Sequence, residues 1–258
     1  MTNEEAHQLA REKGVSRPLY AVVKAIVAPF MRVYFRLRIV GAQRIPREGA
    51  VIIAPNHKSF WDSFFIGVAT KRHVRYMAKS ELFERPTARL LVRLGAFPVR
   101  RGAADADALE TARTVLRQGG VLAVFPEGTR IRDPDELGEP RSGAGRLALE
   151  TCTPLVPAAI SGTENLFLGP LPKPTRVAIS FGEPIEVAGL GPSPETAREI
   201  VAEELWPEVQ REFGMLRAHR GLIAAGLAAL GLGAGVATRR RRTQRRTAQR
   251  RKAKRRKR

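Results

Sequence analysis

Cysteine, aromatic residues and clustered histidines are all scarce in this sequence of 258 residues. The single cysteine, Cys152, excludes an intramolecular disulfide framework and favours a reducing compartment. Because its neighbours are two threonines, we expect Cys152 to pack in the interior rather than to act as a reactive thiol. The four histidines, His7, His57, His73 and His219, do not have the spacing of metal ligands. The sequence therefore predicts neither a metal site nor a disulfide-stabilised fold.

A long apolar segment is also lacking. Residues 1–11 are polar and include two acids, unlike the basic start and apolar core of a secretory signal peptide. The uncharged stretch 222–237 would form a helix of about 24 Å, which is short of a hydrocarbon core of about 30 Å. We therefore expect residues 217–238 to form a short apolar segment that dips into a membrane or lies on it. A marginal spanning helix is the alternative.

Acidic residues are too few to balance the basic ones, and the net charge is +20. Residues 239–258 hold 14 Lys and Arg and no acid, and without them 31 basic residues face 25 acidic ones. We expect this segment to be a disordered polybasic tail that meets anionic lipids, where each basic residue adds about 1 kcal/mol of attraction. A nucleic-acid-binding arm is the alternative, although the tail has no interleaved aromatic residues for base stacking.

Short apolar segments alternate with segments of helical periodicity between residues 41 and 216. The continuous apolar runs 51–54 and 121–125 are typical of strands buried on both faces. Residues 105–118 carry an apolar stripe at helical spacing that ends at two glycines. This alternation predicts a single α/β domain with a mixed central sheet flanked by helices. Residues 1–17 have little pattern and are expected to form a polar lead-in.

Residues 18–40 have the pattern of an amphipathic helix. Apolar residues recur there at three- and four-residue spacing, while Lys24, Arg32, Arg36 and Arg38 interrupt the run. The segment is too charged to span a bilayer. It predicts a helix that lies in the membrane interface with its basic residues at anionic head groups. The alternative is a helix packed on the core of its own domain.

The stretch Asn56-His57-Lys58-Ser59-Phe60-Trp61-Asp62 follows the first buried strand. A turn there would bring Asp62 back to His57. A carboxylate that accepts from one imidazole nitrogen leaves the other free to take a proton from an attacking hydroxyl, and no serine or cysteine nucleophile is then required. The alternative is that Ser59 and Asp62 only mark the start of a helix, with Asp62 satisfying backbone donors. The pair alone leaves both interpretations open.

A second stretch, Pro126-Glu127-Gly128-Thr129-Arg130, ends the other buried strand. In open α/β sheets the carboxyl ends of strands line the ligand crevice. At such a place Gly128 permits close approach of the backbone, Thr129 offers a hydroxyl, and Arg130 can hold a phosphate with two hydrogen bonds. An ordinary turn with solvated charges is the alternative.

Four blocks in this order resemble the glycerophospholipid acyltransferases of the 1-acyl-glycerol-3-phosphate acyltransferase type. They are Asn56-His57-x4-Asp62, residues 95–101, residues 125–130 and Val156-Pro157-x2-Ile160. The resemblance covers residues 35–190, and the order of the blocks is far more specific than any one block. Pro98 and Arg100 depart from the family's second block, which leaves open whether Arg100 or Arg101 faces the pocket; we favour Arg101.

The resemblance implies transfer of a fatty acyl group from a thioester of coenzyme A or acyl carrier protein to the free sn-2 hydroxyl of 1-acyl-glycerol-3-phosphate, giving phosphatidic acid. It implies no acyl-enzyme and no cofactor beyond the thioester co-substrate. His57 would act as the general base and Asp62 would orient it. The implied binding residues for the acceptor are Lys79, Arg101, Glu127, Gly128, Thr129 and Arg130. Among them Glu127 is expected to position Arg130 or a glycerol hydroxyl, because carboxylate and phosphate repel each other.

We therefore expect an enzyme of phospholipid biosynthesis at the cytoplasmic face of the cell membrane, attached peripherally or by a shallow anchor. Its expected partners are a lysophospholipid, an acyl thioester, an anionic membrane surface and, as a candidate, acyl carrier protein. A sister acyltransferase with another lysolipid or glycolipid acceptor is the alternative within the enzyme class. Nucleic-acid binding through the tail is the alternative outside it, and we do not favour it.

Overall fold

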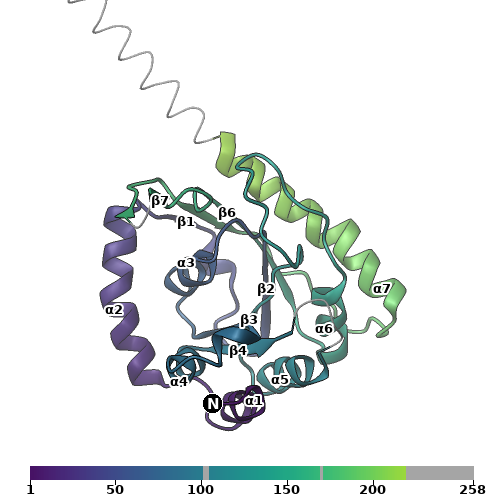
Figure 1. Ribbon diagram of the computed structural model, residues 1–258. Coiled ribbons are helices and arrows are strands. Elements are labelled where there is room, and N and C mark those ends of the chain that lie inside the picture. Colours follow the sequence, from purple (N-terminus) through teal and green to yellow (C-terminus); the bar gives the residue numbers. More distant parts are fainter. Residues whose placement is uncertain (101–104, 169–170, 219–258) are drawn as a thin grey trace, which may run out of the picture. The chain divides into compact units, whose positions relative to one another are not determined.

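The computed structural model describes residues 1–100, 105–168 and 171–218. Residues 1–216 form one compact unit, in which helices cover both faces of a seven-stranded sheet (Figure 1). The expected polybasic tail and almost all of the short apolar segment before it lie outside the described residues. No helix in the described ranges is long and apolar enough to cross a membrane.

The strands of the main sheet follow the order β1-β9-β6-β2-β5-β3-β4. They are β1 (Arg38–Val40), β2 (Val51–Pro55), β3 (Val74–Lys79), β4 (Ala96–Val99), β5 (Val121–Ala123), β6 (Leu155–Ser161) and β9 (Ala178–Phe181). From β6 to β4 all neighbours are parallel, whereas β9 runs antiparallel to β6 and parallel to β1. The predicted mixed α/β sheet is confirmed. The strands β7 (Phe167–Leu168) and β8 (Leu171–Pro172) form a small separate hairpin.

The helices are α1 (Asn3–Glu12), α2 (Arg17–Tyr34), α3 (Asp62–Ala69), α4 (Ala88–Arg93), α5 (Ala106–Arg117), α6 (Gly143–Thr151) and α7 (Pro194–Glu199). Short 3₁₀ turns occur at η1 (Ala42–Arg44) and η2 (Ser80–Leu82). After α7 a π-helical turn, η3 (Ile200–Leu205), leads into further helix. Cys152 caps α6 in a left-handed conformation and is exposed, so our prediction of interior packing was wrong.

Alternate side chains of the central strands enter two separate cores. Ile52 and Ala54 of β2 pack on the face covered by α1, α5, α6 and α7, while Val51 and Ile53 pack on the face covered by α2 and α3 (Figure 1). Every residue of β2 is buried as a result. Burial on both faces explains why these strands are continuous apolar runs rather than alternating ones.

The N-terminal region differs from our expectation at two places. Residues 3–12 are not part of a patternless lead-in but form α1, whose Thr2–Glu5 capping box starts a helix that buries Ala6 and Ala10 completely. The amphipathic helix α2 ends at Tyr34 rather than at residue 40. Arg36 has a left-handed backbone, with φ of 44°, which redirects the chain so that 38–40 can pair with β9. The N-terminal segment is therefore an integral part of the domain.

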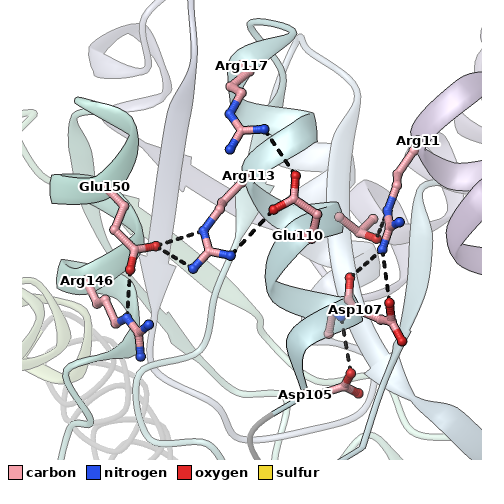
Figure 2. Close-up of polar contacts among 10 residues, drawn as sticks. Arg11, Asp105, Asp107, Glu110, Arg113, Arg117, Arg146 and Glu150 are labelled. Carbon is pink, nitrogen blue, oxygen red and sulfur yellow. Dashed lines mark hydrogen bonds and ion pairs between the residues drawn. The ribbon is translucent and has the colours of Figure 1, made fainter.

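Charged side chains join α5 to α6 on the surface (Figure 2). Arg113 lies between Glu110 of its own helix, at 3.5 Å, and Glu150 of α6, at 2.9 Å. Arg117 also pairs with Glu110, and Arg146 with Glu150. Because these groups are partly exposed, each pair adds little stability. These pairs matter more for the charge of the surface, because the arginines and the glutamates of α5 and α6 neutralise each other.

Candidate active site

Three neighbouring parallel strands deliver the predicted site residues to one edge of the sheet. Strand β2 leads directly to His57, β5 is followed by Glu127, and β3 ends at Lys79. The strands pair in the order β2-β5-β3, so these residues leave the sheet side by side. This carboxyl edge is where open α/β sheets bind ligands.

Asn56 fixes the point at which the chain leaves β2. Its side-chain nitrogen donates to the Ile160 carbonyl at 3.1 Å, and its side-chain oxygen accepts from the Ile160 backbone N–H at 2.7 Å. The side chain of Asn56 thus pairs with the backbone N–H and carbonyl of Ile160 in β6, as the backbone of a neighbouring strand would. The backbone of the next residue, His57, is then free to turn towards the loop that follows β5.

The imidazole of His57 is held by the carboxylate of Asp62. Nδ1 of His57 lies 2.9 Å from Oδ2 of Asp62, and both side chains are buried. The same oxygen accepts the backbone N–H groups of Lys58, at 2.7 Å, and of Ser59, at 2.8 Å. A carboxylate partner places the ring hydrogen on Nδ1, which leaves Nε2 as a proton acceptor. Both sequence interpretations of Asp62 therefore hold together, since it orients the ring and also satisfies backbone donors.

The start of α3 lies later than the sequence suggested. The sequence allowed Ser59 to mark the start of this helix, but the helix begins at Asp62, and its N-cap, Trp61, makes no side-chain capping bond. The carboxylate of Asp62 is instead turned back to the preceding loop. That turn is what brings it to the imidazole.

Both carboxylate oxygens of Glu127 accept hydrogen bonds from the backbone of the site. One carboxylate oxygen accepts the His57 N–H at 2.6 Å, and the other accepts the Gly138 N–H at 2.7 Å. Burial raises the pKa of Glu127, while these two backbone N–H groups act to lower it. Glu127 forms no ion pair with Arg130 among the described residues, whereas its expected contact with a glycerol hydroxyl stays a prediction. Its geometry gives it a positioning role behind His57.

Aromatic packing completes the fixation of the histidine. The imidazole of His57 stacks on Phe125, with ring centroids 3.9 Å apart and planes 25° from parallel. The carbonyl of His57 also accepts the Ile131 N–H at 2.8 Å. Ring, backbone N–H and carbonyl are thus each held by a different partner, which preorganises the base.

Lys58 is a buried residue near the site that the sequence analysis did not single out. Its side chain is 1% exposed, and its ammonium donates to the carbonyls of Asp133, at 2.6 Å, and Glu136. The ammonium also lies 4.9 Å from the centre of the Phe213 ring. Burial lowers the pKa of Lys58, and nearby carboxylates, Glu127 first, act to raise it. Lys58 therefore holds the loop 131–138 against the segment that carries His57.

The loop after β5 carries Gly128, Thr129 and Arg130. Gly128 has φ of +66°, and a side chain there would begin 3.2 Å from the Arg141 guanidinium, so only glycine fits without strain. Thr129 and Arg130 are exposed. Arg130 lines the same cavity as His57 and forms no salt bridge with a carboxylate of the described chain. Its guanidinium is therefore available to an anionic ligand.

The remaining predicted cations have different surroundings. Lys79 also lines the cavity, and its ammonium lies 2.7 Å from Glu81 at the surface. Arg101 lies outside the described residues. Its neighbour Arg100 has its guanidinium 3.5 Å from Asp105, the N-cap of α5. Arg100 is therefore turned towards a structural partner.

A largely apolar cavity of about 290 Å³ opens beside the His57 ring. Its charged or titratable lining includes His57, Tyr76, Lys79 and Arg130 from the strands and the segments that follow them, and Tyr20 and Lys24 from α2. Its apolar lining comes from α2, α3, β3, β4 and α4 with its C-cap, and includes Val23, Val27, Phe64, Val68, Leu91 and Leu94. A base, a guanidinium and an apolar cavity thus meet at one place, which suits a substrate with an anionic head and an aliphatic chain.

Metal-binding groups are not gathered at this site. Within residues 1–100, 105–168 and 171–218, no cluster of three or more His, Cys, Asp or Glu side chains could hold a metal ion.

Comparison with known proteins gives a consistent set of similarities. A family model described as Acyltransferase matches residues 36–161. The 1-acyl-sn-glycerol-3-phosphate acyltransferase of Bacillus subtilis (strain 168) is 29% identical over 167 residues, which are 63% of this chain and 80% of that protein. The enzyme of the same name from Streptococcus pneumoniae is 29% identical over 167 residues, which are 64% of this chain and 60% of that protein.

A solved structure extends the similarity to the fold. The crystal structure of the 1-acyl-sn-glycerophosphate (LPA) acyltransferase from Thermotoga maritima aligns with a TM-score of 0.61 and 26% sequence identity. The alignment covers 81% of this chain and 83% of the Thermotoga chain. The similarity of fold therefore extends well beyond residues 36–161, which the family model matches.

Proposed function

Because this chain belongs to the acyltransferase family that includes the 1-acyl-sn-glycerol-3-phosphate acyltransferases, we propose that it acylates the free sn-2 hydroxyl of 1-acyl-glycerol-3-phosphate and so makes phosphatidic acid. The observation that carries this proposal is the pair of His57 and Asp62, 2.9 Å apart, at a cavity that Arg130 also lines. The acyl donor is a thioester of coenzyme A or of acyl carrier protein.

The proposed reaction needs one base and no covalent enzyme intermediate. Nε2 of His57 removes the proton of the acceptor hydroxyl as its oxygen attacks the thioester carbonyl carbon. The carbon–sulfur bond then breaks, and the leaving thiolate takes the proton back from the imidazolium. Asp62 stabilises the imidazolium between the two steps, because its negative charge lies next to Nδ1.

The phosphate of the acceptor is the proposed anionic partner of the basic residues at the cavity. We propose that Arg130 binds it with two hydrogen bonds and that Lys79 contributes a point charge. Both line the cavity, and Arg130 has no carboxylate partner among the described residues. Arg101 is proposed for the same role from its position in the second sequence block. Gly128 lets the backbone approach the head group, and Thr129 is exposed beside it.

The apolar cavity supports a place for an aliphatic chain. Each methylene group that leaves water for such a cavity gains about 0.8 kcal/mol. We propose that the fatty acyl chain of the thioester enters between α2 and α3, with its carbonyl at His57. The side chains of Val23, Val27 and Val68 lie along that path.

Peripheral membrane attachment is the proposed setting. Helix α2 buries Tyr20, Ala28 and Met31 on one side and exposes four large apolar side chains on another, Val22, Ile26, Phe30 and Val33, by 58%, 70%, 49% and 78%. A stripe of this kind suits a helix that lies in the membrane interface. Both expectations for this segment are thus compatible, since one side packs on the core while the other is open. The cytoplasmic face is proposed because acyl thioesters are supplied there.

The test is acyl transfer by the full chain with palmitoyl-coenzyme A and labelled 1-acyl-glycerol-3-phosphate. We expect labelled phosphatidic acid, and little product from monoacylglycerol, which lacks the phosphate. Arg130→Gln should raise KM for the phosphate-bearing acceptor by about 10- to 100-fold, since a charge-assisted contact contributes about 1.5–3 kcal/mol. Arg198→Gln, on α7, is the matched control.

Two outcomes would change the proposal. Preferred transfer to another lysolipid or to a glycolipid would replace the acceptor and keep the enzyme class. Absence of transfer to any acceptor, with either coenzyme A or acyl carrier protein as the donor's carrier, would overturn the proposed reaction.

A further inference from the structure

A second concavity, the basic groove, lies along α2 and has a volume of about 690 Å³. Its walls come from α2, η1, the turn 45–47 and the turn 70–73. Tyr20, Lys24 and Val68 line both this groove and the active-site cavity. Among the described residues, no acidic residue lines the groove, and six basic residues do: Lys24, Arg32, Arg47, Lys71, Arg72 and His73.

Two of these cations hold the walls of the groove together. The Arg72 guanidinium donates to the carbonyls of Pro46 and Gly49, at 2.9 and 2.6 Å, and to that of Gly119, at 2.6 Å. The Lys24 ammonium donates to the Thr70 carbonyl. Arg72 is thus bonded mainly to backbone carbonyls, while Lys24 uses one of its three N–H groups in this way. These contacts fix the shape of the groove.

Three other cations remain available for a ligand. Arg32, Arg47 and Lys71 are exposed, and none forms a salt bridge with a carboxylate within the described ranges. The contrast is with α5 and α6, where Arg113 and its neighbours are paired with glutamates (Figure 2). These three cations therefore place positive charge in the groove without an ion-pair partner among the described residues.

The cations of the groove also influence one another. Burial lowers the pKa of Lys24, and the charge of Arg32 lowers it further. Burial likewise lowers the pKa of His73, followed by the charges of Arg17 and Lys24. The carboxylate of Glu48 acts to raise the pKa of Arg72, which burial lowers. An anion in the groove would relieve this mutual repulsion.

The groove adjoins the apolar stripe of α2. Ala21 and Arg32, which line the groove, come one position before Val22 and Val33, which belong to the stripe. One residue is about 100° of rotation on a helix, so the groove opens on the flank next to the stripe. A bilayer that touches the stripe would bring its head groups to the mouth of the groove.

We propose that the basic groove binds the phosphate of an anionic phospholipid head group, with Arg32, Arg47 and Lys71 as its ligands. Arginine suits such phosphates because its donors are planar and paired, and lysine adds a point charge. The bound head group fixes the rotation of α2 on the membrane, with the active-site cavity on the other flank of the helix. This inference rests on the proposed membrane attachment, and not on the identity of the acyl acceptor.

The test compares two triple variants of the full chain that lose the same charge. The groove variant is R32Q/R47Q/K71Q, and the control variant, R117Q/R146Q/R198Q, removes three exposed arginines of α5, α6 and α7. Both keep the polybasic C-terminal segment, so its contribution to binding cancels. Binding is measured on vesicles of phosphatidylcholine alone and of equal parts phosphatidylcholine and phosphatidylglycerol.

The groove variant should bind the anionic vesicles about 100-fold more weakly than the control, because each cation contributes about fivefold at an anionic surface. Binding to phosphatidylcholine alone should be the same for both variants. Equal losses in the two variants would mean that only total charge matters, and the proposal would fail. Melting temperatures establish that both variants are folded.

A second arm distinguishes a lipid phosphate from the phosphates of coenzyme A. Acyl transfer is measured with detergent-dispersed acceptor, and KM for palmitoyl-coenzyme A should be unchanged in the groove variant. A tenfold rise in this KM without a loss of vesicle binding would assign the groove to the donor and overturn the lipid site. The vesicle comparison does not need activity, so it stands or fails independently of the proposed reaction.

Discussion

Replacing Asp62 by asparagine changes one buried charge and little else. Oδ2 of Asp62 accepts His57 Nδ1 and the backbone N–H groups of Lys58 and Ser59 at 2.7–2.9 Å. The amide oxygen of asparagine can keep all three bonds. The amide nitrogen takes the place of Oδ1, a buried atom without a hydrogen-bond partner in the described protein. The local backbone should therefore survive, while the negative charge is lost.

The size of the effect follows from the geometry. Proton transfer creates an imidazolium 2.9 Å from the carboxylate oxygen. With an effective dielectric constant of about 20, this pair attracts by about 6 kcal/mol. The two backbone donors already share the carboxylate charge, so we expect a loss of about 4–5 kcal/mol from the transition state. That corresponds to about a 1,000-fold fall in kcat or more.

The assay is steady-state acyl transfer from palmitoyl-coenzyme A to 1-acyl-glycerol-3-phosphate. KM for the acceptor should change little, because Asp62 is fully buried. Asp107→Asn makes the same chemical change in the first turn of α5, with its side chain 63% exposed, and should leave kcat unaltered. An Asp62→Asn variant that melts like the wild type and keeps more than a tenth of its kcat would refute the reasoning.

Three further predictions concern the surroundings of the site. Lys58→Met should lower the melting temperature and kcat, because two loop carbonyls lose charge-assisted hydrogen bonds that contribute about 1.5–3 kcal/mol each. The control Lys13→Met, at the exposed end of α1, should change neither quantity. Ala96→Phe, which narrows the cavity, should move the donor preference from palmitoyl- towards decanoyl-coenzyme A, and an unchanged preference would argue against the acyl path. Burial, followed by the charge of Arg11, lowers the pKa of His7 from its ordinary value of 6.5. Below about pH 6.5 the unfolded chain therefore binds more protons than the folded chain, and the free energy of unfolding should fall as the pH drops. His7→Gln should lessen that fall in acid melting curves, since glutamine can still accept from Thr111, and an unaltered pH dependence would count against this role.

The position of the site was accessible from the sequence because local signals determine it. The runs 51–54 and 121–125 have the composition of buried parallel strands, and each is followed by a proline and a polar stretch. Adjacent parallel strands end at one edge, which brings His57 and Glu127 together. The five-residue spacing of His57 and Asp62 allowed a return of the chain, although the sequence could not separate ring orientation from capping. The structure removes the choice, because one oxygen does both.

The partners of the other site residues were not accessible in this way. Lys58 is buried because a loop about 75 residues later presents two carbonyls to it, and no local pattern reports such a contact. Charge repulsion led us to expect a partner other than phosphate for Glu127, but the sequence could not indicate the backbone N–H groups that it accepts, because every sequence contains such groups. Side-chain types predict which residues can react, whereas backbone partners require the fold.

The N-terminal helix α1 has a local start signal in the sequence. Thr2 and Glu5 have the spacing of a capping box, and α1 begins there. Its buried positions are Ala6, His7 and Ala10, which are small or polar and give almost no apolar periodicity. The end of α2 had no comparable signal, because Arg36 adopts a left-handed conformation that usually falls to glycine or asparagine.

The most direct test of the central claim, that Nε2 of His57 takes the proton of the acceptor hydroxyl, is the single-turnover rate of His57→Ala with saturating palmitoyl-coenzyme A and 1-acyl-glycerol-3-phosphate. A positioned general base contributes about 10²–10⁴-fold to such a step. We predict a rate at least about 1,000-fold below the wild type with the melting temperature retained. A rate within tenfold of the wild type would contradict the account.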